Sequence, residues 1–182
     1  MRVFWEKGYL GASLSDLTGA MGINRPSLYA AFGNKEELYR KVLDRYVQSS
    51  AAGLAESISQ PTARDVAEHF LQRVIRLLTS RDSPGTCLVV HGMLSCGGRG
   101  EPLSDEFQNR RSAAHAELCA RFKRARAEGD LQESADPSAL AHYLQAITFG
   151  LSVMSFSGAT KRELQQVVRT AVETWPGCAP RE

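Results

Sequence analysis

The sequence has 182 residues, of which 43% are hydrophobic and 23% charged, and its formal net charge is +2. This length allows one domain, or a small domain joined to a larger one, with a sizeable buried core, and the composition excludes general disorder. The four cysteines form no C-x-x-C pair, and no uninterrupted apolar stretch is long enough to span a bilayer. We therefore expect a protein of the reducing cytoplasm, without a zinc knuckle, a disulfide framework or a membrane partner.

The sequence begins with the end of a predicted helix. Residues 1–7 form its last turns, Gly8 is expected to close it in the left-handed αL conformation, and Tyr9 is expected to pack back against it.

Two short helices joined by a tight turn are predicted next. Ser13 and Asp16 have the spacing of a capping box at the start of the first helix. Gly22 suits the positive φ that often follows a helix, and Asn24 is placed to start the second helix, with Pro26 in its first turn. Such a helix-turn-helix leaves polar groups at the exposed N-terminal end of its second helix, where they suit phosphates and base edges.

Six more helices are predicted beyond this motif, which makes the fold all-α with about nine helices. They cover about 34–58, 62–78, 87–95, 104–129, 139–156 and 160–175. Capping pairs three residues apart, such as Asn34 with Glu37, mark several of their starts. The run 87–95 is short and apolar, so a strand stays open for it.

Three local features of these helices lead to further expectations. The glycines at 97, 98 and 100 are interpreted as a loop, because no strand precedes them and no G-K-[ST] follows. The basic residues at the end of the helix 104–129 are expected to be solvated, and they are Arg121, Lys123, Arg124 and Arg126. The residues of 62–78 expected to face inward are Val66, Phe70, Val74, Leu77 and Leu78.

The last two helices carry more apolar surface than one protomer is expected to cover. The helix 139–156 is apolar on nearly every side, and His142, Gln145 and Thr148 within it argue against a membrane span. The final helix carries one apolar stripe. Together they predict a homodimer, and the residues expected at its interface are Tyr143, Leu151, Met154, Leu164, Val168 and Val172.

The stretch M-G-I-N-R-P-S-L-Y-A-A-F-G-N-K-E-E-L resembles the DNA-binding signature of the TetR family of bacterial transcriptional repressors. An αα-hairpin that only packs is the alternative reading of a bare helix-turn-helix pattern. The resemblance implies a DNA-binding domain over 1–46 and an effector-binding and dimerisation domain over 47–182. It also implies a homodimeric repressor that binds double-stranded operator DNA at a palindrome and is released by an unknown small-molecule effector.

The family pattern also implies functional residues by position. Contacts to DNA are expected from Ser13, Arg25, Pro26, Ser27, Tyr29 and Lys35. An effector pocket is expected among the helices that hold Phe70, Val74, His91, Leu94, His115, Leu118 and Ile147. No cofactor and no catalytic residue is expected.

This chain departs from the family pattern at two places. It starts partway along the helix that the family has there, so we expect a shortened first helix, through a misassigned start, missing residues or a shortened protein. Thr18 stands where the family usually has Ala at a close helix contact.

Other functions stay open as alternatives. A helical small-molecule-binding protein whose head no longer binds DNA is the first, and an enzyme that uses a Cys or His of the body is the second. No G-x-S-x-G or H-E-x-x-H motif supports an enzyme. His115 and Cys119 are four residues apart, which permits metal coordination, but ordinary packing is the expected reading and no metal is predicted.

Overall fold

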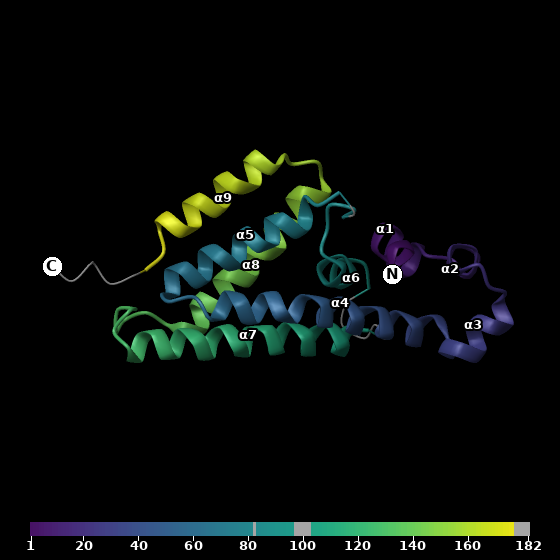
Figure 1. Ribbon diagram of the computed structural model, residues 1–182, viewed down its shortest axis with the longest axis horizontal. Helices are drawn as coiled ribbons and strands as arrows, with labels where there is room; N and C mark the ends of the chain where they lie inside the picture. The colour runs from purple at the N-terminus through teal and green to yellow at the C-terminus, as the bar shows by residue number, and fades with distance from the viewer. Residues whose placement is uncertain (82, 97–102, 177–182) are drawn as a thin grey trace. The chain divides into compact units, whose positions relative to one another are not determined.

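The computed structural model describes residues 1–81, 83–96 and 103–176, and the regular elements in this part of the chain are all helices (Figure 1). They are α1 (Arg2–Gly11), α2 (Leu14–Met21), α3 (Arg25–Phe32), α4 (Lys35–Ile58), α5 (Ala63–Leu78), α6 (Leu88–Cys96), α7 (Ser104–Ala127), α8 (Pro137–Phe156) and α9 (Lys161–Glu173). The predicted all-α fold is confirmed, and residues 88–96 form a helix rather than a strand. The glycines at 97, 98 and 100 lie outside the described residues.

The chain folds into two compact units. The N-terminal unit comprises Met1–Ala51 and Thr86–Phe107, and the C-terminal unit comprises Ala52–Gly85 and Gln108–Glu182. This division differs from the predicted one at residue 46, because α6 lies against α1 and buries Leu88 in the core of the N-terminal unit.

Aromatic rings form the centre of the N-terminal core. The ring centroid of Tyr39 lies 4.9 Å from that of Phe4 and 6.4 Å from that of Phe107, both in edge-on arrangements. A Cβ at Gly92 of α6 would overlap both Tyr39 and Phe107. This glycine therefore allows α6 to approach the rings closely.

Gly8 interrupts α1 instead of ending it. Its φ of 70° is positive, as predicted, but its ψ of 176° is extended and not the αL value. The chain then resumes a helical path to Gly11. The predicted αL cap at Gly8 is therefore wrong, and the residue produces a kink within α1.

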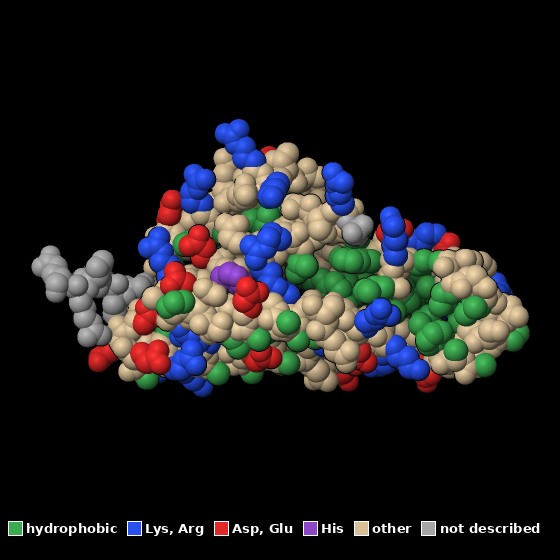
Figure 2. All heavy atoms as spheres, in the orientation of Figure 1, with side chains coloured by type: hydrophobic (Ala, Val, Ile, Leu, Met, Phe, Trp, Pro, Cys, Tyr) green, Lys and Arg blue, Asp and Glu red, His purple; other side chains and the backbone are tan. Residues whose placement is uncertain are grey.

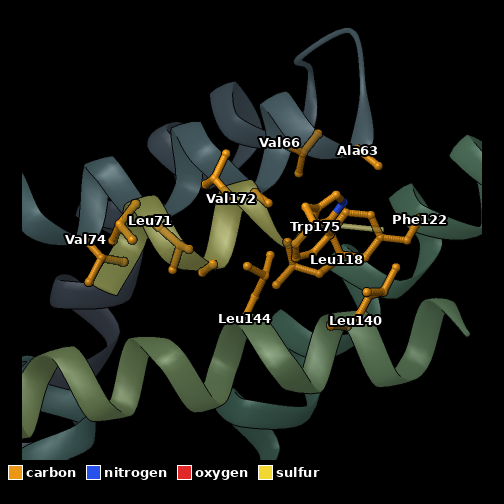
Figure 3. Close-up of a cluster of buried hydrophobic side chains, with 14 of the residues drawn as sticks. Ala63, Val66, Leu71, Val74, Leu118, Phe122, Leu140, Leu144, Val172 and Trp175 are labelled. Carbon is orange, nitrogen blue, oxygen red and sulfur yellow. The ribbon is translucent and has the colours of Figure 1, made fainter. Parts of the chain in front are cut away.

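The core of the C-terminal unit is built from α5, α8 and α9, which contact one another, together with residues of α7 (Figures 1 and 3). The ring of Trp175 packs against that of Phe122, with centroids 5.4 Å apart (Figure 3). The inward face of α5 includes Leu71 and Ile75. Leu77, which the pattern predicts to face inward, is instead 39% exposed, because it lies to one side of the stripe formed at spacings of three and four.

Arg121 is buried rather than solvated, which corrects the prediction for the end of α7. Its side chain is 5% exposed and donates hydrogen bonds to three backbone carbonyl oxygens at and just after the end of α4. The acceptors are those of Ile58 at 3.0 Å, Gln60 at 2.8 Å and Pro61 at 2.9 Å. Carbonyls at a helix end lack partners within the helix, so this arginine supplies the missing donors. The basic residues exposed as predicted are Lys123, Arg124 and Arg126.

Candidate DNA-binding site

The helix-turn-helix is held by local caps that the sequence predicts. Ser13 and Asp16 form the reciprocal capping box of α2. Gly22 ends α2 in the αL conformation, with φ 65° and ψ 29°. The side-chain oxygen of Asn24 accepts a hydrogen bond from the backbone N–H of Ser27 at 2.8 Å and so caps α3.

One face of α3 is exposed and polar, and the opposite face holds the helix in place. Leu28 is fully buried in the core of the N-terminal unit. Tyr29 is 46% exposed, and the side chains of Arg25, Pro26 and Ser27 are also exposed. The four residues predicted to meet DNA from α3 therefore lie on the surface of a packed helix.

Arg25 makes one contact that the sequence does not predict. Its Nη2 donates a hydrogen bond to Oγ of Ser15 on α2 at 3.1 Å. Both side chains are exposed. The guanidinium is thus held by a neutral hydroxyl from the neighbouring helix.

Ser13 uses both of its hydrogen-bond donors within the capping box. Its backbone N–H and its hydroxyl donate to Oδ2 of Asp16 at 3.0 and 2.7 Å. Asp16 also accepts from Nζ of Lys7 at 2.6 Å, and hydrogen bonds from Lys7 and Ser13 hold the pKa of its carboxyl far below the usual value. A phosphate contact by Ser13 would require it to exchange one of these bonds, so its role in DNA binding stays a prediction.

Two lysines of the N-terminal unit lie over aromatic rings. The ammonium of Lys35 is 4.7 Å from the ring centroid of Tyr9, and burial lowers its pKa. The ammonium of Lys41 lies 5.5 Å from the ring centroid of Phe32. Among the described residues the partner of each ammonium is a neutral ring, so Lys41 joins Lys35 as a candidate for phosphate contact. The sequence carries no signal for Lys41, because its ring partner lies in the preceding helix.

Two arginines of this unit pair with acids. Arg40 contacts Glu36 at 2.8 Å and Glu106 at 2.9 Å, and these carboxylates raise its pKa. Arg2 pairs with Glu6 at 2.7 Å. On the face drawn in Figure 2, Lys and Arg side chains are scattered among acidic ones. The cations available to DNA are therefore few and individually placed.

The residues predicted for an effector pocket fall in both units. His91 and Leu94 lie on α6 in the N-terminal unit, where Leu94 is 71% exposed. The other five belong to the C-terminal unit and are Phe70, Val74, His115, Leu118 and Ile147.

Within the C-terminal unit these pocket residues differ in exposure. Val74 and Leu118 are buried in the core, and Phe70 and Ile147 pack against it. The ring of His115 lies against that of His142, with centroids 4.0 Å apart and the ring planes tilted by 33°. No group of three or more His, Cys, Asp or Glu residues in the described part of the chain could hold a metal ion. The effector pocket stays a prediction.

Most of the predicted dimer contacts lie inside the protomer. Four of the six residues have little or no surface left for a partner, because they are buried in the core of the C-terminal unit, and these are Leu151, Leu164, Val168 and Val172. Tyr143 is 41% exposed and Met154 is partly exposed. The surface that α8 can offer to a partner therefore differs from the predicted one.

The exposed face of α8 is largely apolar and lies beside a groove. Tyr143, Ala146, Gly150 and Val153 are exposed at helical spacing, with His142 among them on the same face. Tyr143 also lines a groove of about 360 Å³ against α9, whose other lining residues are Ile147, Gln166, Val167, Thr170 and Ala171.

Among the described helices, α8 alone is long and apolar enough to cross a membrane by length and composition, and 33% of its most apolar window is buried. A core helix of a folded protein passes the same test. Gln145 of α8 is buried and donates its Nε2 hydrogen to the backbone oxygen of Arg111 on α7 at 2.8 Å, as expected of a helix that packs on protein.

The fold and this site define a helical DNA-binding protein with an N-terminal helix-turn-helix. Residues 1–42 match the family model described as bacterial regulatory proteins, tetR family, and residues 63–172 match the tetracyclin repressor-like C-terminal domain. The chain belongs to the TetR family of transcriptional regulators, which act by binding DNA and not as enzymes.

Several known regulators are similar to this chain over nearly its whole length, which agrees with this membership. The HTH-type transcriptional repressor ComR of Escherichia coli is 29% identical over 97% of this chain and 85% of its own. A cysteine mutant of the regulator CifR, solved with 26 bp double-strand operator DNA, is 36% identical with a TM-score of 0.89, over 96% of this chain and 92% of that one. A regulator from Rhodococcus sp. RHA1 is 36% identical with a TM-score of 0.67, over 98% and 96% of the two chains.

Proposed function

We propose that this protein is a cytoplasmic repressor that binds a palindromic operator as a homodimer and leaves it when a small molecule binds the C-terminal unit. The observation that carries the proposal is the exposed polar face of α3, presented by a capped and packed helix-turn-helix. CifR, with 36% identity, is bound to operator DNA in its solved complex. The intact caps and core also weigh against the alternative of a head that no longer binds DNA.

Mobility shift with DNA from upstream of the protein's own gene tests the proposal directly. We expect a shifted band that disappears when unlabelled operator is added as competitor and persists when random DNA is added. If a folded wild-type protein shifts neither operator fragments nor sequences selected from a random duplex pool, the protein is not a DNA-binding repressor.

Arg25→Ala is expected to weaken binding to the operator and relax its sequence preference. A guanidinium at the start of a recognition helix can bond a guanine with two N–H groups, which is worth about 1–3 kcal/mol of discrimination. Titration of operator and random duplexes measures both effects. Equal losses on the two DNAs would assign Arg25 to the phosphates instead.

Lys35→Ala is expected to weaken binding to all DNA alike. Removal of one lysine–phosphate ion pair should reduce the slope of log affinity against log salt by roughly 0.9. Lys41→Ala should behave in the same way, and Lys161→Ala, on the exposed start of α9, is the matched control that should leave the slope unchanged. A slope that stays at the wild-type value in Lys35→Ala would contradict the assignment.

The dimer is proposed to form through the exposed face of α8 and the groove beside α9. The exposed stripe that includes Tyr143 and Val153 leaves apolar area in water unless a second copy covers it. A Cβ at Gly150 would meet nothing within 4 Å, so this part of the helix is open to close approach. Isologous packing of two such faces would pair the helices of the two protomers.

Release by an effector requires the two heads of the dimer to change their spacing. Recognition helices enter successive major grooves about 34 Å apart. The effector can favour another spacing only by as much as it binds that state better, so operator and effector must oppose each other reciprocally. Titration of a bound small molecule with and without saturating operator measures this coupling, and equal affinities would exclude that molecule as an inducer.

A further inference from the structure

We infer that Ser15 is a positioning residue for sequence recognition, which holds the guanidinium of Arg25 ready for a base. This inference rests on the proposed operator binding. Its basis is the hydrogen bond from Nη2 of Arg25 to Oγ of Ser15 at 3.1 Å, which joins the start of α2 to the start of α3.

The geometry leaves the guanidinium able to read a base. A guanidinium has five N–H donors in a fixed plane, and Ser15 uses one of them. Four donors stay available, and two suffice for the bidentate contact to O6 and N7 of guanine. The hydroxyl therefore orients the guanidinium before DNA binds. Without it, the long side chain would lose its rotational freedom on binding, which would weaken the complex.

The neighbouring acid does not compete for Arg25. Asp16 follows Ser15 in the sequence, but its Oδ1 accepts from Lys7 and its Oδ2 from Ser13. Arg25 is consequently held by a neutral oxygen rather than by a carboxylate. A carboxylate partner would bind the guanidinium more strongly and oppose its transfer to a base.

Ser15 itself can be changed without harm to the fold. It lies in the first turn of α2, its side chain is exposed, and Ser13 rather than Ser15 makes the cap of this helix. Alanine is a good helix residue, so Ser15→Ala removes the hydroxyl with no expected loss of α2. Ser15→Thr is the matched control, because it keeps an oxygen in the same place.

The experiment uses the full chain and the duplex that the wild-type protein selects from a randomised pool. Failure of the wild type to select any sequence would contradict the proposed function itself. If a sequence is selected, the affinities of Ser15→Ala and Ser15→Thr are measured on it and on random DNA, each in the wild-type and the Arg25→Ala background, across a range of salt concentrations.

We expect Ser15→Ala to bind the selected duplex about three- to ten-fold more weakly, with random DNA and the salt slope unchanged. Ser15→Thr should stay within about two-fold of wild type, and Ser15→Ala should have no further effect when Arg25 is absent. Equal losses on both duplexes that persist in the Arg25→Ala background would show that Ser15 contacts a phosphate directly, and the salt slope would not change because the hydroxyl is neutral. That result, or affinities unchanged in every background, would overturn the inference.

Discussion

Val168→Glu is expected to prevent folding of the C-terminal unit. Val168 is 1% exposed and belongs to the core of its own protomer. An ionised carboxylate placed there has no partner, and the desolvation penalty together with the poorer packing costs about 5 kcal/mol or more. Since whole domains are stable by about 5–15 kcal/mol, loss of the cooperative thermal transition in circular dichroism is the expected result.

Val153→Glu tests the proposed dimer surface without disturbing the core of the protomer. Val153 lies on the same helix face as Tyr143 and is 47% exposed, so a glutamate there stays solvated in a monomer and the fold should survive. In a dimer the same carboxylate would be buried in an apolar interface. Sedimentation at micromolar concentration should therefore show folded monomers for Val153→Glu and dimers for wild type.

Gln165→Glu is the matched control for this comparison. It adds the same charge to an exposed position of α9 that does not line the groove, so the dimer should persist. A monomeric wild type would contradict the proposed interface, and so would a Val153→Glu variant as dimeric as the control. A folded Val168→Glu variant would contradict the placement of Val168 in the core.

The helix-turn-helix could be predicted because its structure depends on neighbours in the sequence. The capping box of Ser13 and Asp16 spans three residues, and the αL turn at Gly22 depends on one residue type. The exposed position of Arg25 follows from the same local pattern. Its hydroxyl partner at Ser15 does not, because the contact depends on the crossing of two helices and leaves no sequence signal.

The hydrophobic pattern of the last two helices does not determine which of their apolar residues pack inside the protomer. The pattern of α8 identifies it as apolar on nearly all sides but does not separate the face that packs in its own protomer from the face left outside. Leu151 is fully buried and Val153 is 47% exposed, although both are apolar and two positions apart. Which face meets α5 and α9 depends on tertiary packing, so four predicted interface residues lie in the core.

The role of Arg121 could not be predicted from the sequence. Three neighbouring basic positions on α7 are exposed, and only the fold places Arg121 beside carbonyls about sixty positions earlier in the chain. On the other side of the same turn, the carboxylate of Asp130 accepts from the backbone N–H of Ala63 at the start of α5. The end of α4 and the start of α5 are thus both held by residues near the end of α7.

Arg121→Ala is expected to lower the free energy of unfolding by about 3–5 kcal/mol, because three partly buried carbonyls lose their donor and the buried side chain leaves a cavity. Burial lowers the pKa of this guanidinium, because the charged form loses solvation. Part of the energy of its hydrogen bonds offsets this cost. We therefore expect the lost hydrogen bonds, rather than the lost charge, to account for the decrease in stability. Arg121→Lys should recover less than half of the loss, since a single ammonium cannot reproduce bonds made by Nε and Nη2.

Arg124→Ala is the control on the same helix. Arg124 is exposed and lies 3.7 Å from Glu128 in a solvated ion pair, so its loss should change stability by less than about 0.5 kcal/mol. Urea unfolding at one fixed protomer concentration compares the three variants with wild type, because dimerisation would make the midpoint depend on concentration. If Arg121→Ala lowers the free energy of unfolding no more than Arg124→Ala does, the buried arginine does not stabilise this turn. Water would then be bonding the carbonyls at the end of α4 in its place.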